Sequence, residues 1–159
     1  MKIIFLDIDG VLNYAKCSAK SATGCLGIDD AKCKLLSEIV VQTSAKVVLT
    51  STWKTDWMLC ENIEDLPRDG YYLETKLRQH NIHIIDKTED PAWSQRGVGI
   101  RSFLESTSLD VEQFVIIDDE SFDFHQQGLA SNFVKTSFTT GILPEHVEKA
   151  VNILNDSKS

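Results

Sequence analysis

The sequence predicts an α/β fold, a Rossmann-like, doubly wound three-layer sandwich in which about five parallel strands lie between helices. Short, mostly apolar runs occupy residues 2–6, 46–50 and 113–118. Runs of this kind, without polar alternation, are typical of strands buried on both faces of a parallel sheet. Segments with helical periodicity separate them, and this alternation of strand and helix indicates a doubly wound domain.

The remaining elements can be assigned in chain order. Asp29 and Asp30 can cap a helix that runs to about Ser44, in which leucine, isoleucine and valine recur at helical spacing. Weaker strands are expected at residues 82–86 and 132–136. Further helices are expected over Tyr72–His80, Gly97–Glu105 and Pro144–Leu154.

A single domain is expected over residues 1–156, followed by a frayed tail at 157–159, because a chain of 159 residues can bury one core without staples. Residues 13–28 are small, polar and glycine-bearing. They follow the first strand, where α/β folds place their binding loops, so we expect either a flap loop beside a site or a plain surface loop. The segment between Gly10 and Asp29 is too short for a folded domain, which predicts a minimal cap.

Composition limits the classes of partner and location. The chain has 16 basic and 24 acidic residues and a formal charge of −8. No cluster of lysine and arginine is visible, so strong non-specific binding of nucleic acid is not expected. The apolar start of the chain is too short for a signal peptide, and no run reaches the roughly 18 apolar residues of a membrane span. We therefore expect a cytoplasmic protein whose four cysteines are free thiols.

Asp7 and Asp9 follow the first strand two residues apart, so their side chains can leave the same face, and Gly10 lets the backbone turn sharply. Two adjacent carboxylates are costly unless a cation neutralises them, and Mg²⁺ binds a few carboxylates together with phosphate and water oxygens. In such a site Asp7 is a candidate nucleophile toward phosphorus and Asp9 a candidate acid/base. The alternative is a structural acidic turn.

The other strand ends supply matching groups. Asp118 and Asp119 end the run at 113–118 and can complete a metal site with Asp7, although such a cluster could also be a solvated helix start. Thr50 and Ser51 end the run at 46–50, where hydroxyl and backbone donors suit a phosphate oxygen.

Phosphoryl transfer also needs a cation to offset developing charge. Arg96, which opens the helix before the strand at 113–118, is the preferred candidate. Lys54, four residues after Thr50, is the rival, and either could be a surface charge. Arg96 and Lys54 are therefore both candidates for binding phosphate. Tryptophans 53, 57 and 93 flank these segments and could stack a base, although packing is the more common role of such residues.

These segments resemble the four motifs of the haloacid dehalogenase (HAD) superfamily in their order along the chain. The matching pieces are DIDGVLN at 7–13, VVLTS at 47–51, Arg96 and VIIDD at 115–119. More narrowly, LTSTWK, RGVGIRSFL, FVIIDDESFD and VKTSFTTGIL resemble the HAD domain of Swiss-army-knife RNA repair proteins. The third motif is more often lysine in the superfamily, and arginine makes a forked contact instead of a point-charge one.

The resemblance implies a HAD-type phosphatase that hydrolyses phosphomonoesters through an aspartyl-phosphate on Asp7, with Mg²⁺ as cofactor. It implies that Asp9 is the general acid/base and lends its backbone carbonyl to the metal, that Thr50 binds phosphate, and that Asp118 or Asp119 is the direct metal ligand. The implied substrate is a phosphorylated small molecule or a nucleic-acid end. Two alternatives are a receiver-like phosphate-accepting signalling domain, in which the acidic pair precedes the phosphorylated aspartate, and a catalytically idle HAD-like binding module.

Overall fold

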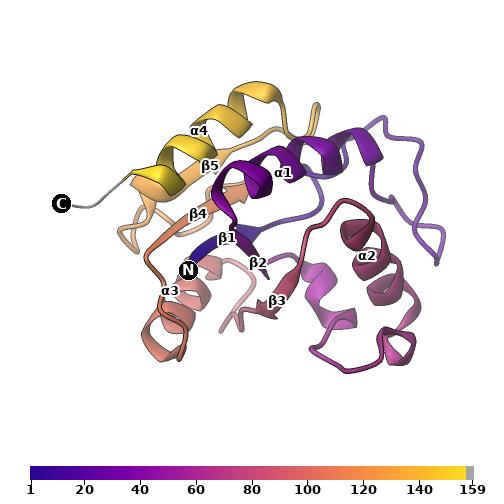
Figure 1. Cartoon of the computed structure of the whole chain (residues 1–159), viewed down its shortest axis with the longest axis horizontal. Helices are drawn as coiled ribbons and strands as arrows, with labels where there is room; N and C mark the ends of the chain where they lie inside the picture. The colour runs from indigo at the N-terminus through magenta and orange to yellow at the C-terminus, as the bar shows by residue number, and fades with distance from the viewer. Residues whose placement is uncertain (157–159) are drawn as a thin grey trace.

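The structure, a computed structural model, describes residues 1–156 and contains one five-stranded sheet in which every pairing is parallel (Figure 1). The strands lie in the order β3-β2-β1-β4-β5, so that β1 is central. The predicted α/β class and the five parallel strands are confirmed. The strand bounds are β1 Lys2–Leu6, β2 Lys46–Leu49, β3 Ile84–Lys87, β4 Gln113–Asp118 and β5 Phe133–Lys135.

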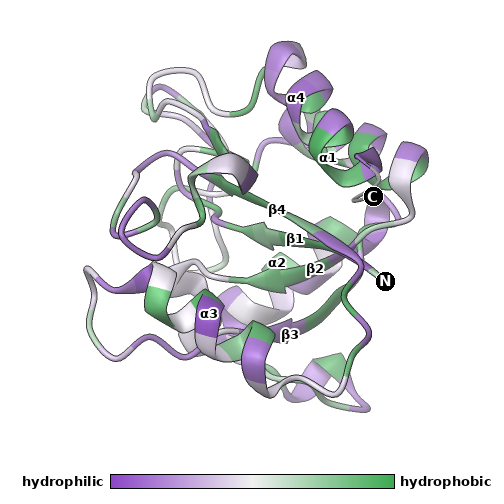
Figure 2. Cartoon of the chain, turned by 90° about the vertical axis from the view of Figure 1, so that its left-hand side faces the viewer, coloured by the Kyte–Doolittle hydropathy of each residue, from purple (hydrophilic) through white to green (hydrophobic). Residues whose placement is uncertain are grey.

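Helices cover both faces of the sheet. Helices α1 and α4 lie side by side over one face, and α3 lies on the other, as Figures 1 and 2 show from two directions. No described helix has both the length and the apolar character needed to cross a membrane. The helix bounds are α1 Asp30–Thr43, α2 Arg68–Gln79, α3 Arg96–Ser106 and α4 Pro144–Asn155, with short 3₁₀ helices η1 Thr52–Asp56, η2 Ile63–Asp65 and η3 Ala130–Asn132.

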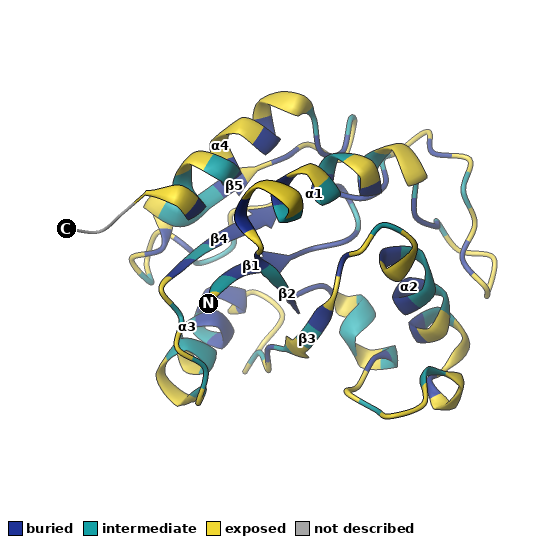
Figure 3. Cartoon of the chain, viewed as in Figure 1, coloured by how far each residue is buried: buried dark blue, intermediate teal, exposed yellow. Residues whose placement is uncertain are grey.

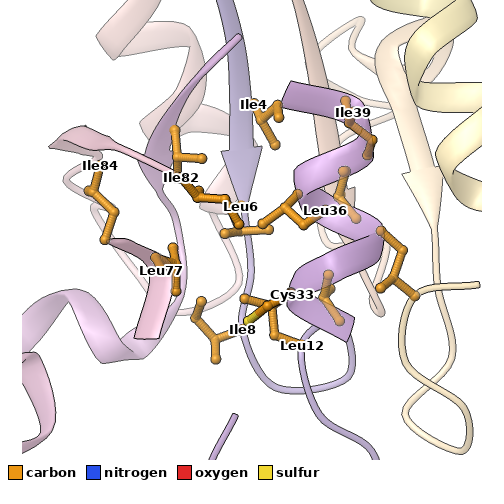
Figure 4. Packing of buried hydrophobic residues seen from close by; sticks show 14 of the residues in the cluster. Ile4, Leu6, Ile8, Leu12, Cys33, Leu36, Ile39, Leu77, Ile82 and Ile84 are labelled. Atoms are coloured by element: carbon orange, nitrogen blue, oxygen red, sulfur yellow. The ribbon is translucent and has the colours of Figure 1, made fainter. Parts of the chain in front are cut away.

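The core is divided by the sheet into two layers because successive strand residues point to opposite faces. In β1, Ile4 and Leu6 join the layer beneath α1, α2 and α4, whereas Ile3 and Phe5 join the layer beneath α3. Figure 4 shows the first layer, with side chains of α1 facing those of β1. The central strands β1, β2 and β4 are buried along most of their length, whereas the outer strands β3 and β5 each contain an exposed residue (Figure 3). This burial explains why the central strands are apolar without alternation.

The register of the sheet brings the carboxyl ends of the central strands together. The Asp7 amide donates to the Ile117 carbonyl at 3.0 Å, and the Thr50 amide donates to the Leu6 carbonyl at 3.0 Å. Asp118 is the last residue of β4. The candidate residues Asp7, Thr50 and Asp118 therefore lie together at the carboxyl ends of the strands, where open α/β sheets bind their ligands.

Some element boundaries differ from the sequence prediction. Helix α2 begins at Arg68 rather than Tyr72, because Pro67 occupies the N-cap and the polar first turn carries no apolar periodicity. Strand β3 begins at Ile84, two residues later than predicted, and its pairing with β2 contains a register shift. The predicted tail at 157–159 lies outside the described residues.

The predicted flap loop, residues 13–28, contains one isolated antiparallel bridge and is attached to α2. The Asp69 carboxylate accepts hydrogen bonds from the Thr23 hydroxyl at 2.6 Å and the Thr23 amide at 3.1 Å. The Tyr72 hydroxyl accepts one from the Ile28 amide at 3.0 Å. This loop forms one wall of the space above the strand ends.

Candidate active site

Three carboxylates converge at the carboxyl ends of β1 and β4. Asp7, Asp118 and Asp119 each offer an oxygen that lies within 4.8 Å of the other two. Asp7 and Asp118 are buried, and Asp119 is partly exposed. Because β1 and β4 are neighbours in the sheet, the convergence follows directly from their register.

One buried guanidinium joins two of these carboxylates. Nη1 of Arg96, at the start of α3, lies 3.1 Å from Oδ1 of Asp7 and 2.7 Å from Oδ2 of Asp118. Burial, aided by the nearby Asp118 carboxylate and opposed by Arg96, raises the pKa of Asp7 well above its ordinary value. Burial also raises the pKa of Asp118 to about 6, although Arg96 lowers it. One guanidinium therefore does not compensate the cost of burying these acids.

The donor set fits a magnesium ion. Mg²⁺ is a hard cation that takes carboxylate oxygens and retains positions for water and phosphate. Both oxygens of Asp118 already accept hydrogen bonds, from Arg96 and from the Glu120 amide at 3.0 Å. The Asp119 carboxylate has no hydrogen-bond partner within residues 1–156, so its oxygens are free to coordinate a metal. Each Asp118 oxygen keeps a second lone pair, so both aspartates can contribute, and the choice between Asp118 and Asp119 as the direct ligand stays a prediction.

Gly10 holds the turn after Asp9 against the acidic cluster. Its φ is +83°, in the left-handed region, and a Cβ at this position would overlap the Asp119 carboxyl group. The Gly10 amide donates to Asn13 Oδ1 at 2.9 Å, and its carbonyl accepts from the Thr136 hydroxyl at 2.6 Å. Only glycine combines this backbone conformation with so close an approach of Asp119.

The Asp9 side chain has a different set of partners from the Asp7 cluster. Its carboxylate accepts a hydrogen bond from Asn13 Nδ2 at 2.8 Å, and both of its oxygens lie 3.3 Å from Trp53 Nε1. It lines a cavity of about 380 Å³ that opens beside the flap loop. This position suits a group that exchanges a proton with a leaving oxygen, and the predicted metal contact of its backbone carbonyl stays a prediction.

The predicted phosphate-binding hydroxyls lie at the end of β2. Thr50 is fully buried, and its Oγ1 is one of three buried polar side-chain atoms that have no partner among the described residues. A buried hydroxyl without a partner is unfavourable and is explained if an external oxygen completes it. Ser51 differs, because its hydroxyl caps η1 by accepting from the Trp53 amide at 3.2 Å.

The structure separates the two candidate cations. Lys54 Nζ lies 2.7 Å from Asp90 Oδ2 and 3.1 Å from the Thr88 hydroxyl, so its ion pair is with Asp90 and not with Asp7. Arg96 contacts Asp7 directly and also lies over the Phe122 ring, with 4.4 Å between Cζ and the ring centroid. The geometry therefore favours Arg96 as the charge-offsetting group.

Sequence reasoning did not predict the contacts of three residues that shape this site. Asn13 bridges Asp9, Gly10 and the flap carbonyl of Gly27, and it is fully buried. The sequence predicts base stacking or packing for Trp53, and the structure adds a contact of its indole N–H with the Asp9 carboxylate. The Phe122 ring packs against the Arg96 guanidinium, and the Phe122 backbone has a φ of +42°. The available signal was weak: an asparagine four residues after Asp9, and an aromatic residue after an acidic cluster.

Comparison with known proteins identifies the family. A family model described as "HAD domain in Swiss Army Knife RNA repair proteins" matches residues 3–147, which is most of the chain. No curated protein and no solved structure matched the chain. The matched range contains β2, β3, β4 and β5 whole, β1 from Ile3 onward, and every residue of the site described above. The chain therefore belongs to the family of HAD domains in Swiss Army Knife RNA repair proteins, and its type is that of a HAD hydrolase.

Proposed function

We propose that the chain is a Mg²⁺-dependent phosphomonoesterase that transfers a phosphoryl group to Asp7 and then to water. The observation that carries the proposal is the contact of one buried guanidinium with Asp7 and Asp118 inside a cluster of three carboxylates. Asp7, Asp118 and Asp119 would hold the ion. When bound, Mg²⁺ would stabilise negative charge on the phosphoryl oxygens and reduce the repulsion between these oxygens and the Asp7 carboxylate.

In the first step an oxygen of Asp7 attacks phosphorus and forms an acyl-phosphate bond. The bond between phosphorus and the leaving oxygen breaks, and Asp9 gives its proton to that oxygen, so that a free alcohol departs. Arg96, already 3.1 Å from Asp7, offsets charge that accumulates on the phosphoryl group. The buried Thr50 hydroxyl, which has no partner among the described residues, can donate to a phosphoryl oxygen.

In the second step water attacks phosphorus of the aspartyl-phosphate while Asp9, now ionised, accepts the proton. The bond between Asp7 and phosphorus breaks, which releases inorganic phosphate and restores both aspartates. Asn13 and Trp53 hold the Asp9 carboxylate in one orientation through both steps. Each proton given in the first step is thus recovered in the second.

The receiver-like alternative is disfavoured by topology. The receiver order of strands is 2-1-3-4-5, whereas this sheet has the order 3-2-1-4-5. The second alternative is a catalytically idle binding module with a HAD fold. It is disfavoured by a buried carboxylate cluster and an unpaired buried hydroxyl, which are costly to retain without a ligand.

For the substrate we propose a phosphorylated small molecule or a nucleic-acid end held at the active site, since a chain of formal charge −8 repels polyanions elsewhere. We also propose a cytoplasmic location. Support comes from the four cysteines, which are free thiols in the structure and are compatible with a reducing compartment.

The test is turnover of p-nitrophenyl phosphate with Mg²⁺ and with excess EDTA, by the wild-type protein and by Asp7→Asn. The asparagine has nearly the volume of the aspartate but lacks the nucleophilic carboxylate. We expect Mg²⁺-dependent turnover in the wild type, none in Asp7→Asn, and matching circular dichroism spectra. Equal activity of the two proteins would refute the role of Asp7, and inactivity of the wild type would favour the idle module.

A further inference from the structure

The cavity beside Asp9 is the space that would hold the alcohol part of a substrate. It has a volume of about 380 Å³ and is lined by the flap loop, η1, the first turn of α2 and the segment after β5. Asp9 is one of the residues that line it, and in the proposed reaction Asp9 gives a proton to the leaving oxygen. Whatever is attached to that oxygen therefore extends into this cavity.

Part of the cavity wall is flat, apolar and fixed in place. The Trp53 ring is held at its nitrogen by Asp9 and on its face by Tyr72, with 6.3 Å between the ring centroids and an interplanar angle of 29°. Leu26 and Phe138 complete this wall, and Phe138 is 44% exposed. A rigid aromatic surface of this kind favours a planar or apolar group without loss of side-chain entropy.

The rest of the lining is acidic. Asp56 and Asp69 contribute carboxylates in addition to that of Asp9, and the residues that line the cavity include neither lysine nor arginine. Burial raises the pKa of Asp69, but hydrogen bonds from Thr23 and Ser21 outweigh it and leave the value below the ordinary one. Asp69 therefore carries its charge at neutral pH, and an anion placed in the cavity meets like charge.

The cations near the cavity have other partners. Arg68, next to Asp69, helps to lower the pKa of Asp69, and its guanidinium donates to the Ala22 carbonyl at 2.6 Å. Arg96 contacts Asp7 and Asp118 on the phosphoryl side, and Lys54 is paired with Asp90. A second phosphate or a carboxylate on the alcohol would find no cation among the residues that line the cavity, whereas an ammonium group would find carboxylates.

We propose, resting on the phosphomonoesterase function above, that this cavity selects substrates whose alcohol part is uncharged or cationic and presents a flat apolar face. It discriminates against alcohol parts that carry a second anionic group. The substrate class is thus a phosphomonoester of a neutral or amine-bearing alcohol. An end of a longer nucleic-acid chain, with phosphodiesters next to the scissile bond, is the less favoured substrate.

The test uses three phenyl phosphates that differ only in the para substituent: aminomethyl, hydroxymethyl and carboxylate. Their kcat/KM values are measured at low ionic strength, where charge effects are least screened, and each is divided by the uncatalysed rate. We expect the order aminomethyl, hydroxymethyl, carboxylate, with roughly tenfold between the neutral and the anionic ester from two carboxylates within several ångströms. Equal values, or a preference for the carboxylate, would overturn the inference.

Two variants assign the selectivity to the cavity. Asp56→Asn removes one lining charge at constant size and should reduce the aminomethyl-to-carboxylate ratio by roughly threefold or more. Asp110→Asn is the matched control. This exposed residue precedes β4 and so lies near the amino ends of the strands, opposite to the site, and the ratio should not change. An unchanged ratio in Asp56→Asn would contradict the proposal.

The same assay separates this inference from the proposed function. If none of the three esters and no p-nitrophenyl phosphate is hydrolysed, the phosphomonoesterase function fails and the selectivity fails with it. If all are hydrolysed with flat selectivity, only the inference about the cavity fails.

Discussion

Replacement of Arg96 by methionine tests the electrostatic design of the site through stability alone. Methionine retains most of the length of the side chain but removes the charge that lies 3.1 Å from Asp7 and 2.7 Å from Asp118. Both carboxylates then remain buried without a counter-ion. Breaking a buried ion pair in this way costs about 3–5 kcal/mol, and we expect a loss of this size in the metal-free protein above pH 7.

The loss should depend on pH in a defined direction. Burial raises the pKa of Asp118 to about 6 in the folded protein, and Arg96 opposes this rise, so the pKa should be higher still in the variant. Between pH 4 and the folded-state pKa, the folded protein binds a proton that the unfolded chain releases, so the free energy of unfolding falls as pH rises. At pH 5 Asp118 is mostly protonated in both proteins, and the difference between them should shrink by a factor of about two or more.

The assay is urea denaturation of both proteins in EDTA at pH 5 and pH 8. Arg101→Met is the matched control, because this arginine also belongs to α3 but, among residues 1–156, its guanidinium donates only to the carbonyls of Gln127 and Gly128. The decrease in the free energy of unfolding that Arg101→Met causes should be the same at pH 5 and pH 8. Adding Asp118→Asn to Arg96→Met should recover part of the stability at pH 8. A pH-independent loss in Arg96→Met, or no recovery in the double variant, would refute the electrostatic reasoning.

Three further predictions concern the metal and the positioning of the arginine. Mg²⁺ at about 100 times its Kd should raise the free energy of unfolding by about 2.7 kcal/mol, and Asp119→Asn should remove most of this increase in thermal denaturation. Gly10→Ala should lose the same Mg²⁺-dependent stabilisation in calorimetry, because its Cβ displaces the Asp119 carboxyl, whereas Gly24→Ala, with open space around it, should retain it. Phe122→Leu should lower kcat about tenfold by loosening Arg96, with KM nearly constant; an unchanged kcat would show that the ring is only packing.

The strands were predictable because each central strand is buried on both faces and therefore has an unbroken apolar sequence. The run at 113–118 coincides with β4, and the aspartates at the strand ends meet because parallel strands end at one edge. The start of α2 was not predictable, since its polar first turn resembles the loop before it. Periodicity therefore located the scaffold better than the ends of its helices.

The contacts of single side chains were less accessible to sequence reasoning. The pairing of Lys54 with Asp90 joins residues 36 apart and depends on how η1 and the segment after β3 fold together. The bridge from Asn13 to Asp9 depends on the conformation of a loop that has no periodic pattern. Nothing in the residue types alone distinguishes such an asparagine from one that faces solvent.

The central claim is that Asp7 carries the phosphoryl group during turnover. The most direct measurement is peptide mass spectrometry on Asp9→Asn protein that has been mixed with p-nitrophenyl phosphate and Mg²⁺ and then quenched in acid, since loss of the base slows the second step. We predict the mass of one phosphoryl group on the peptide that contains Asp7, and no such mass when Asp7→Asn is combined with Asp9→Asn. A phosphoryl group on any other residue, or its persistence in that double variant, would contradict the account.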